Sequence, residues 1–422
     1  MKIKQIRVDG YKNLINCELN LGDFNILVGP NNSGKSNLLE AIQLLFPICF
    51  GDEELRNKIL SGTTLPPRFT SSISHLKKYE KKPLNIGIGF EIRENNKLWR
   101  VDYDVTTQCN ANKEISGFLK ESLAAKLISK PLKPGKANSY ILREGKELKV
   151  KEKGKTTLKK YLISKNNSSL LAIPSLYADF EGLSPEFKLF YDMILKISTT
   201  RIFSISPKAI RNSIYLENDI DDMQVTSFDL SLIADTLQKE NKYYDLFKES
   251  LCDILGIESA YFEAEDVSPP KTRNETNGKT KRIRVFALKR KGDRFALIDE
   301  YSDGTLVVIA ILEALLLEKT RGPILCLEEL ENCLHPAVME KMLRFLQDHS
   351  DKWPVLITTH SPYLLNGVRP EDVHVAVVDN DGATHFEKVE NSVQLRNYLN
   401  KNLFSFGELL INNFQDFIGK QV

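Results

Sequence analysis

The segment Gly29–Ser36, GPNNSGKS, constrains this chain of 422 residues more than any other part of the sequence. It has the spacing G-x-x-x-x-G-K-S and follows a short apolar run, Phe24 to Val28, which is typical of a buried parallel strand. Leu38 to Phe46 then has helical periodicity, and we expect Pro47 to end that helix. A strand, a tight turn and a helix N-terminus surround an anion with backbone N–H groups, so the sequence predicts a phosphate-binding loop.

The residue types in this loop suit a nucleotide. Glycine is needed where a Cβ would collide with a phosphate or where φ is positive. We expect Lys35 to reach the outer phosphates and the Ser36 hydroxyl to bind Mg²⁺. A chance glycine-rich turn is disfavoured by the strand before the loop and the helix after it. The residues predicted to contact the nucleotide are Gly29, Pro30, Asn31, Asn32, Ser33, Gly34, Lys35, Ser36 and Asn37.

A second apolar run, Pro323 to Leu327, ends in the adjacent carboxylates Glu328 and Glu329. Phosphoryl transfer needs one acid beside the magnesium ion and a base that orients the attacking water. We assign the metal side to Glu328 and the base to Glu329. Two glutamates at a strand end are by themselves usually a solvated edge, and the phosphate loop is what favours the catalytic interpretation.

Two further motifs frame this acidic strand. Ser302, Asp303 and Gly304 precede an apolar helix, where a hydroxyl and free N–H groups suit a phosphate, although an ordinary helix cap has the same pattern. His360 follows another buried strand and is expected to hydrogen-bond the γ-phosphate as a sensor. We interpret His335 as a helix cap or surface residue rather than a metal ligand.

The order GPNNSGKSN, YSDGT, ILCLEELENCLHP and LITTHSPYLL resembles the ABC-type ATPases of the RecF, SMC and OLD group. It is most similar to the stand-alone AAA ATPases of bacterial DNA-repair and anti-phage systems, including the Septu type. The resemblance covers residues 1–105 and 285–422, and LFSFGELL resembles the closing segment of the same group. It implies that Ser302, Asp303 and Gly304 form a signature loop that touches the γ-phosphate bound by a second subunit. It further implies that Glu329 is the base, that His360 is the switch histidine, and that Lys12 and Asn13 lie near the nucleotide.

The sequence departs from the family pattern in three places. The metal-side acid is Glu328, where aspartate is usual. The signature reads S-D-G, where transporter domains prefer S-G-G, which favours the DNA-repair and defence branch. No glutamine clearly matches the Q-loop of the family, and Gln108 is a weak candidate for it. Asp379 and Asp381 mimic the D-x-D of a nuclease module, but their surroundings favour a hairpin turn.

The expected fold class is α/β, an ABC-ATPase-like core with a mixed sheet, helices and an antiparallel β subdomain, interrupted by a mostly helical insertion. Residues 1–205 should hold the phosphate loop and the β subdomain, which includes a meander near residues 84–105. Residues 206–284 should form the helical insertion. Residues 285–422 should complete the core with the signature, the acidic strand and the switch histidine.

Composition limits the choice of partners. The net charge of +2 does not indicate a nucleic-acid partner, so DNA contacts would depend on lysines between Lys126 and Lys165 and on the basic segment Lys271 to Arg284. A solvated surface is the competing interpretation of both. The six cysteines lack zinc-site spacing and are expected to be free thiols in a reducing cytosol, and no segment is apolar enough for a membrane span.

These features predict a cytoplasmic ATPase that binds ATP and Mg²⁺ and dimerises head-to-head around ATP. It would act as a switch on DNA or on a separate effector protein, in DNA repair or antiviral defence. The alternative is a weakly hydrolysing, ATP-bound scaffold that assembles and restrains an effector nuclease or toxin. A transporter subunit is disfavoured by the S-D-G loop, and an intrinsic nuclease lacks an acidic cluster of its own.

Overall fold

Two units divide the chain in the computed structural model. The first comprises Met1–Ile202, Gly322–Cys326 and Ser350–Val422, and the second comprises Phe203–Arg321 and Leu327–His349. The structure describes residues 1–52, 54, 82–109, 115–128, 137–198, 202–204, 243–257, 259–265, 283–289, 301–316, 323–332, 334–389, 395, 397, 399, 401 and 405–410.

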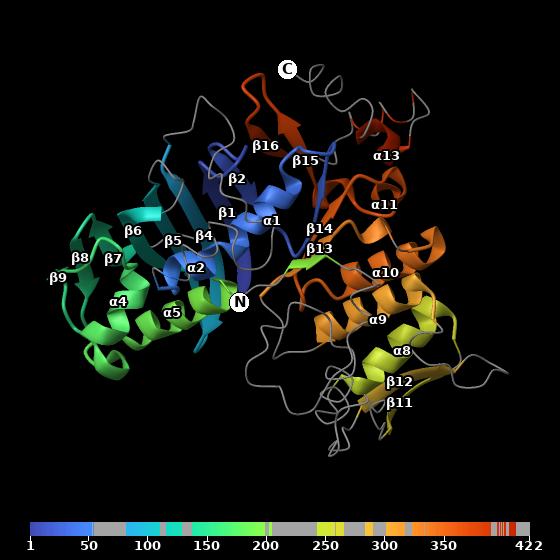
Figure 1. The fold of residues 1–422 in the computed structure, drawn as a ribbon, viewed down its shortest axis with the longest axis horizontal. Coiled ribbons are helices and arrows are strands. Elements are labelled where there is room, and N and C mark those ends of the chain that lie inside the picture. Colours follow the sequence, from blue (N-terminus) through green and yellow to red (C-terminus); the bar gives the residue numbers. More distant parts are fainter. Residues whose placement is uncertain are drawn as a thin grey trace, which may run out of the picture. The chain divides into compact units, whose positions relative to one another are not determined.

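An antiparallel eight-stranded sheet forms much of the first unit, in the order β2-β1-β4-β5-β6-β7-β8-β9 (Figure 1). Its strands are β1 (Lys2–Asp9), β2 (Cys17–Asn20), β4 (Leu84–Glu94), β5 (Lys97–Cys109), β6 (Ile115–Ile128), β7 (Asn138–Glu144), β8 (Glu147–Lys151) and β9 (Leu158–Leu162). Burial alternates along β2 and β8, as expected for a sheet with one covered face.

Helices α4 (Ser169–Leu176) and α5 (Pro185–Ser198) belong to the same hydrophobic core as this sheet. Phe190 of α5 meets the rings of Trp99 and Tyr140 edge-on, with centroids 5.7 and 5.3 Å apart. Aromatic rings prefer this geometry because the positive edge of one ring faces the negative face of the other. The strands that carry Trp99 and Tyr140 are thereby fixed to α5.

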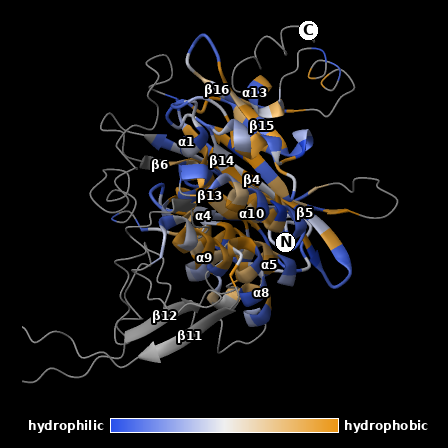
Figure 2. Cartoon of the chain, turned by 90° about the vertical axis from the view of Figure 1, so that its right-hand side faces the viewer, coloured by the Kyte–Doolittle hydropathy of each residue, from blue (hydrophilic) through white to orange (hydrophobic). Residues whose placement is uncertain are grey.

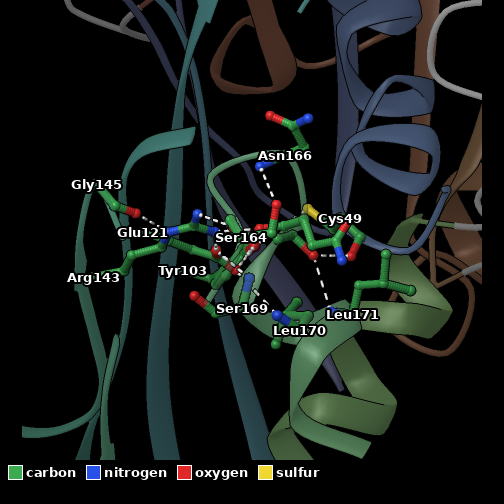
Figure 3. Close-up of polar contacts among 12 residues, drawn as sticks. Cys49, Tyr103, Glu121, Arg143, Gly145, Ser164, Asn166, Ser169, Leu170 and Leu171 are labelled. Atoms are coloured by element: carbon green, nitrogen blue, oxygen red, sulfur yellow. Dashed lines mark hydrogen bonds and ion pairs between the residues drawn. The ribbon is translucent and has the colours of Figure 1, made fainter. Parts of the chain in front are cut away.

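A buried polar network ties α4 to the sheet (Figure 3). The Glu121 carboxylate of β6 accepts from the Tyr103 hydroxyl at 2.8 Å and from the Ser169 N–H at 2.6 Å, at the start of α4. The Arg143 guanidinium of β7 lies 3.7 Å from Glu121, and both side chains are fully buried. Arg143 also donates to the carbonyl oxygens of Gly145, Asn167 and Ser164. Because each charge has several partners, the network offsets the cost of removing the charges from water.

The second sheet has the order β10-β13-β14-β3-β15-β16. Its strands are β3 (Phe24–Val28), β10 (Ile202–Ser204), β13 (Leu325–Glu328), β14 (Val355–Thr359), β15 (Val373–Val378) and β16 (Thr384–Lys388). Both β14 and β15 run parallel to β3, whereas β16 is antiparallel to β15. Every residue of β3 and β14 is buried, which explains why these two strands are continuous apolar runs.

The remaining helices of the first unit are short. They are α1 (Lys35–Gln43), α2 (Leu45–Cys49), η2 (Ala178–Phe180), α11 (Pro362–Asn366), η5 (Pro370–Asp372) and α13 (Phe406–Glu408). The prediction that Pro47 ends the helical segment is wrong. Pro47 lies in the first turn of α2, where its missing N–H has no partner to lose.

The described part of the second unit contains α8 (Tyr244–Leu255), α9 (Asp303–Leu316), α10 (Pro336–Asp348), η4 (Leu330–Asn332) and an antiparallel pair, β11 (Ser259–Glu265) and β12 (Ile283–Lys289). Helix α8 packs against both α9 and α10. Helix α9 is buried from Thr305 to Leu316, and Figure 2 colours it predominantly as hydrophobic. A helix that is apolar all round belongs in the interior of its unit.

The α/β core with an antiparallel β subdomain is confirmed, including the predicted meander and the β15–β16 hairpin. The helical insertion at 206–284 stays a prediction, because residues 205–242 and 266–282 lie outside the described residues, along with most of the basic segment Lys271 to Arg284. Cys17, Cys49, Cys252 and Cys326 are free thiols, whereas Cys333 lies outside the described residues. None of the described helices is long and apolar enough to cross a bilayer.

Candidate functional site

The phosphate loop starts where β3 ends, between two parallel neighbours. Thr359 of β14 and Val375 of β15 both align with Val28, the last residue of β3. Gly34, the N-cap of α1, has a φ of 87°, and Asn32 has a φ of 64°. Residues with a left-handed backbone conformation within such a turn direct successive N–H groups into one concavity, which suits an anion. The predicted strand, loop and helix are therefore all present.

Lys35 is held inside this loop. Its Nζ donates to the carbonyl oxygens of Gly29 and Pro30 at 2.7 and 2.8 Å, and its side chain is buried. The rim residues Pro30, Asn31 and Asn32 are exposed. The loop thus combines a fixed positive charge with access from solvent, as a triphosphate requires. Ser36 adds a hydroxyl at the first turn of α1, a hard oxygen donor of the kind that Mg²⁺ prefers.

Both glycines of the loop lie against the β15–β16 hairpin. A Cβ at Gly29 would lie 2.9 Å from the Cβ of Ala376, and one at Gly34 would lie 2.9 Å from Thr384 Oγ1. Neither position has room for a side chain, so the hairpin requires these glycines as much as the loop conformation does. Sequence reasoning predicted the hairpin from its Asp-Gly turn but missed Ala376 and Thr384, because no local signal indicates that the hairpin faces the loop.

Asn13 connects the phosphate loop to this hairpin. Its Nδ2 donates to Thr384 Oγ1 at 2.9 Å, and its Oδ1 accepts from Asn37 Nδ2 at 2.6 Å. The N–H of Thr384 donates to the carbonyl oxygen of Asn13 at 2.8 Å. Asn13 therefore lies against the first turn of α1 and the β15–β16 hairpin, and a contact with the nucleotide stays a prediction.

Lys12 has a different environment. Its ammonium forms a buried ion pair with Glu40 of α1, and Glu40 also accepts from the Tyr11 hydroxyl at 3.0 Å. Burial and the neighbouring Glu40 raise the pKa of Tyr11, so the phenol stays protonated and donates. Lys12 itself has a φ of 49°, an unusual value for a residue with a side chain. A contact between Lys12 and the nucleotide also stays a prediction.

Thr359 of β14 pairs with Val28 of β3. His360 follows Thr359 in the sequence, just as Gly29 follows Val28. The parallel register therefore places His360 beside the start of the phosphate loop, at the carboxyl edge of the sheet. The side chain is exposed, and the next residue is fixed because the Ser361 N–H donates to Thr359 Oγ1 at 2.9 Å. A contact between His360 and a γ-phosphate stays a prediction.

The acidic pair lies at the end of β13, the strand that carries the chain from the first unit into the second between Cys326 and Leu327. Glu328 is the last residue of the strand, and Glu329 has a φ of 51°. A non-glycine residue in the left-handed region is strained, and such strain is concentrated at functional positions. The Glu329 carboxylate accepts from Asn332 Nδ2 at 2.6 Å, which fixes its orientation.

The signature candidate lies at the start of α9. Ser302 Oγ accepts from the Thr305 N–H at 3.3 Å, so the serine caps the helix, while Ser302 and Asp303 are exposed. His335 caps α10 by accepting from the Ala337 N–H, which agrees with its interpretation as a structural residue.

The structure brings the phosphate loop, Asn13 and His360 together in the first unit, whereas Ser302, Asp303, Gly304 and Glu329 belong to the second. Gln108 is exposed near the end of β5. Asp379 accepts from the N–H groups of Asp381 and Ala383, both at 2.9 Å. These bonds, above all that from Ala383, lower the pKa of Asp379. The aspartates thus serve a turn, as the hairpin interpretation predicted.

Comparison with known proteins agrees with this geometry. Residues 24–136 and 196–366, more than half of the chain, match the AAA_21 family, described as "AAA domain, putative AbiEii toxin, Type IV TA system". A search of curated proteins found no match.

Several solved SMC head domains are similar to the chain. A head bound to the C-terminal winged-helix domain of ScpA has a TM-score of 0.50 and 13% identity, and covers 94% of this chain and 100% of that one. The head from Thermotoga maritima gives 0.42 and 14%, with 92% and 100% covered. A head from Pyrococcus furiosus, also bound to a ScpA domain, gives 0.44 and 12%, with 95% and 99% covered.

The family match spans the phosphate loop, the signature candidate, the acidic strand and His360. The likeness to the first of these SMC heads extends over nearly the whole chain and concerns the fold alone. The chain therefore belongs to the AAA_21 family of AAA domains and has the ABC-ATPase-like fold of an SMC head.

Proposed function

We propose that this protein binds ATP with Mg²⁺ and hydrolyses it. The phosphate loop binds the triphosphate through its N–H groups and Lys35, while Ser36 and Glu328 hold the metal. Bound Mg²⁺ would neutralise charge on the phosphate oxygens. Glu329 orients and deprotonates the attacking water, and His360 hydrogen-bonds the γ-phosphate.

This proposal rests on one observation, which is that Lys35 and His360 lie at the same carboxyl edge of the second sheet. The ammonium is fixed within the loop by two carbonyl oxygens, and the parallel register of β3 and β14 puts an exposed histidine beside that loop. A site that only recognised an anion would need Lys35 alone. A site that distinguishes ATP from ADP also needs a group such as His360 near the γ-phosphate, because only ATP carries that phosphate.

We further propose that two copies face each other, so that Ser302, Asp303 and Gly304 of one copy complete the site of the other. The exposure of Ser302 and Asp303 supports this, because a signature loop must be accessible to a partner. The resulting homodimer would close on ATP and reopen after hydrolysis. That movement would act on DNA or on a separate effector protein, in DNA repair or antiviral defence.

A weakly hydrolysing scaffold is the second candidate. Glu328 is one methylene longer than aspartate, which shifts the carboxylate relative to any metal at the strand end. The family description mentions a toxin, and two of the similar SMC heads were solved with a domain of ScpA. Both facts support a protein that holds a partner, such as an effector nuclease or toxin, while ATP is bound.

The test is steady-state ATP hydrolysis by the purified protein, with its size measured with and without ATP. Glu329→Gln should abolish turnover and accumulate an ATP-bound dimer. Lys35→Ala should abolish both turnover and the ATP-bound dimer. Glu340→Gln is the matched control, because Glu340 is an exposed residue of α10 that pairs with Arg344. A protein that remains monomeric with ATP would overturn the dimer, and turnover that survives Glu329→Gln would overturn the assignment of the base.

A further inference from the structure

A short segment near the C-terminus packs on the helix that follows His360. Helix α13 contacts α11 (Figure 1), and the Gly407 N–H donates to Asn366 Oδ1 at 2.8 Å. The segment is internally ordered, because Ser405 and Glu408 cap each other's backbone N–H groups. Leu409 and Leu410 are buried. The segment is thus anchored in the first unit, close in space to the His360 loop.

Gly407 lies closer to α11 than any other residue type could. A Cβ at this position would overlap the carbonyl oxygen of Pro362 and lie 2.7 Å from its carbonyl carbon and Cα. These are backbone atoms, so no rotamer change can relieve the contact. The φ of Gly407 lies outside the left-handed region, so this glycine is required by proximity and not by backbone conformation.

We propose that Gly407 is a positioning residue for His360, an inference that rests on the proposed function. Its backbone contact with Pro362 and its hydrogen bond to Asn366 fix both ends of α11. Pro362 is two residues from His360, and the hydrogen bond between Ser361 and Thr359 leaves the intervening backbone little freedom. A displacement of Pro362 is therefore transmitted to His360. The phosphate loop and Lys35 do not take part in this contact and remain intact.

Gly407→Ala tests the proposal. We expect kcat for ATP to fall by about 10- to 100-fold, because a displacement near 1 Å costs that much at a reacting group. The Kd for ATP should stay within about twofold, because Lys35 supplies the binding. The matched control is Gly22→Ala, whose added Cβ would have its nearest neighbours at ordinary distances of 3.6 and 3.7 Å. A wild-type kcat in Gly407→Ala would overturn the proposal.

A double-mutant cycle separates positioning from general damage. In a His360→Ala background, Gly407→Ala should cause no further loss of kcat, because residues that act as a unit are not additive. An equal loss in both backgrounds would contradict the proposal. If Gly407→Ala fails to fold, Asn366 supplies the second test. Asn366→Asp keeps the acceptor for the Gly407 N–H and should retain kcat, whereas Asn366→Leu removes it and should lower kcat.

Hydrogen exchange tests the contact without relying on hydrolysis. The amides of Ser361 and of residues 363–366 should exchange faster in Gly407→Ala than in the wild type, and unchanged exchange would overturn the positioning role. An inactive wild-type protein would refute the proposed ATPase, but the exchange result would still decide whether Gly407 fixes the His360 loop. The two failures are therefore distinguishable.

Discussion

Thr384→Val removes one hydroxyl from the support of the phosphate loop and keeps the shape of the side chain. Thr384 is fully buried, and its Oγ1 accepts from Asn13 Nδ2 at 2.9 Å. A buried donor that loses its partner costs ~1–3 kcal/mol. Because Asn13 is half-buried and its Nδ2 also donates to the carbonyl oxygen of Asn32 at 3.5 Å, we take the lower end, ~1 kcal/mol. ATP must restore the loop before it binds, so this cost should weaken binding about fivefold.

A titration with fluorescent ATP, or calorimetry, measures this change in Kd. The matched control is Thr106→Val, since Thr106 Oγ1 accepts from Asn85 Nδ2 at 2.8 Å and joins β4 to β5 by the same chemistry. We expect Thr106→Val to bind ATP as the wild type does. If both variants bind ATP equally, or if Thr384→Val matches the wild type, the hairpin does not support the phosphate loop as we infer.

Two further predictions concern stability and reactivity. Glu121→Gln leaves the buried Arg143 without its counter-charge and should lower the free energy of unfolding by ~3–5 kcal/mol, measured by denaturant titration. The control is Glu147→Gln, which should have little effect because Glu147 forms exposed ion pairs with Lys149 and Lys160. An unchanged midpoint for Glu121→Gln would contradict the stabilising role of the network. Burial raises the pKa of Cys17 and of Cys326 to about 12, so both thiols stay protonated and should resist alkylation near pH 8 until the protein unfolds; rapid native labelling, located by mass spectrometry, would refute this.

The elements around the phosphate loop were predictable because their signals are local. A strand that is buried on both faces must be continuously apolar, and β3 and β14 are. The turn residues then fixed where each strand ends, which located Gly29 and His360. The residues that support the loop were not predictable. Ala376 and Thr384 matter only because the hairpin packs against two glycines that are more than 340 positions away in the sequence.

Strand β6 illustrates the other limit. Its sequence, ISGFLKESLAAKLI, is rich in residues that favour helices, but it pairs with β5 from Ile115 to Ile128 and with β7 from Lys120 to Ala125. Glu121 in this strand resembles a surface residue in the sequence and is instead fully buried beside Arg143. Tertiary packing decides both outcomes, and neither leaves a pattern in the neighbouring residues. The close approach of Gly407 to Pro362 is hidden from the sequence for the same reason.

The composite site can be tested by mixing two inactive variants. Lys35→Ala removes the phosphate contact of one copy, and Ser302→Ala removes the signature contact that it would offer its partner. If each site combines Lys35 from one copy with Ser302 from the other, an equal mixture contains heterodimers with one intact site and should regain ATP hydrolysis that neither variant has alone. A mixture as inactive as either variant alone would contradict the account, because the two groups would then serve the same ATP within one chain.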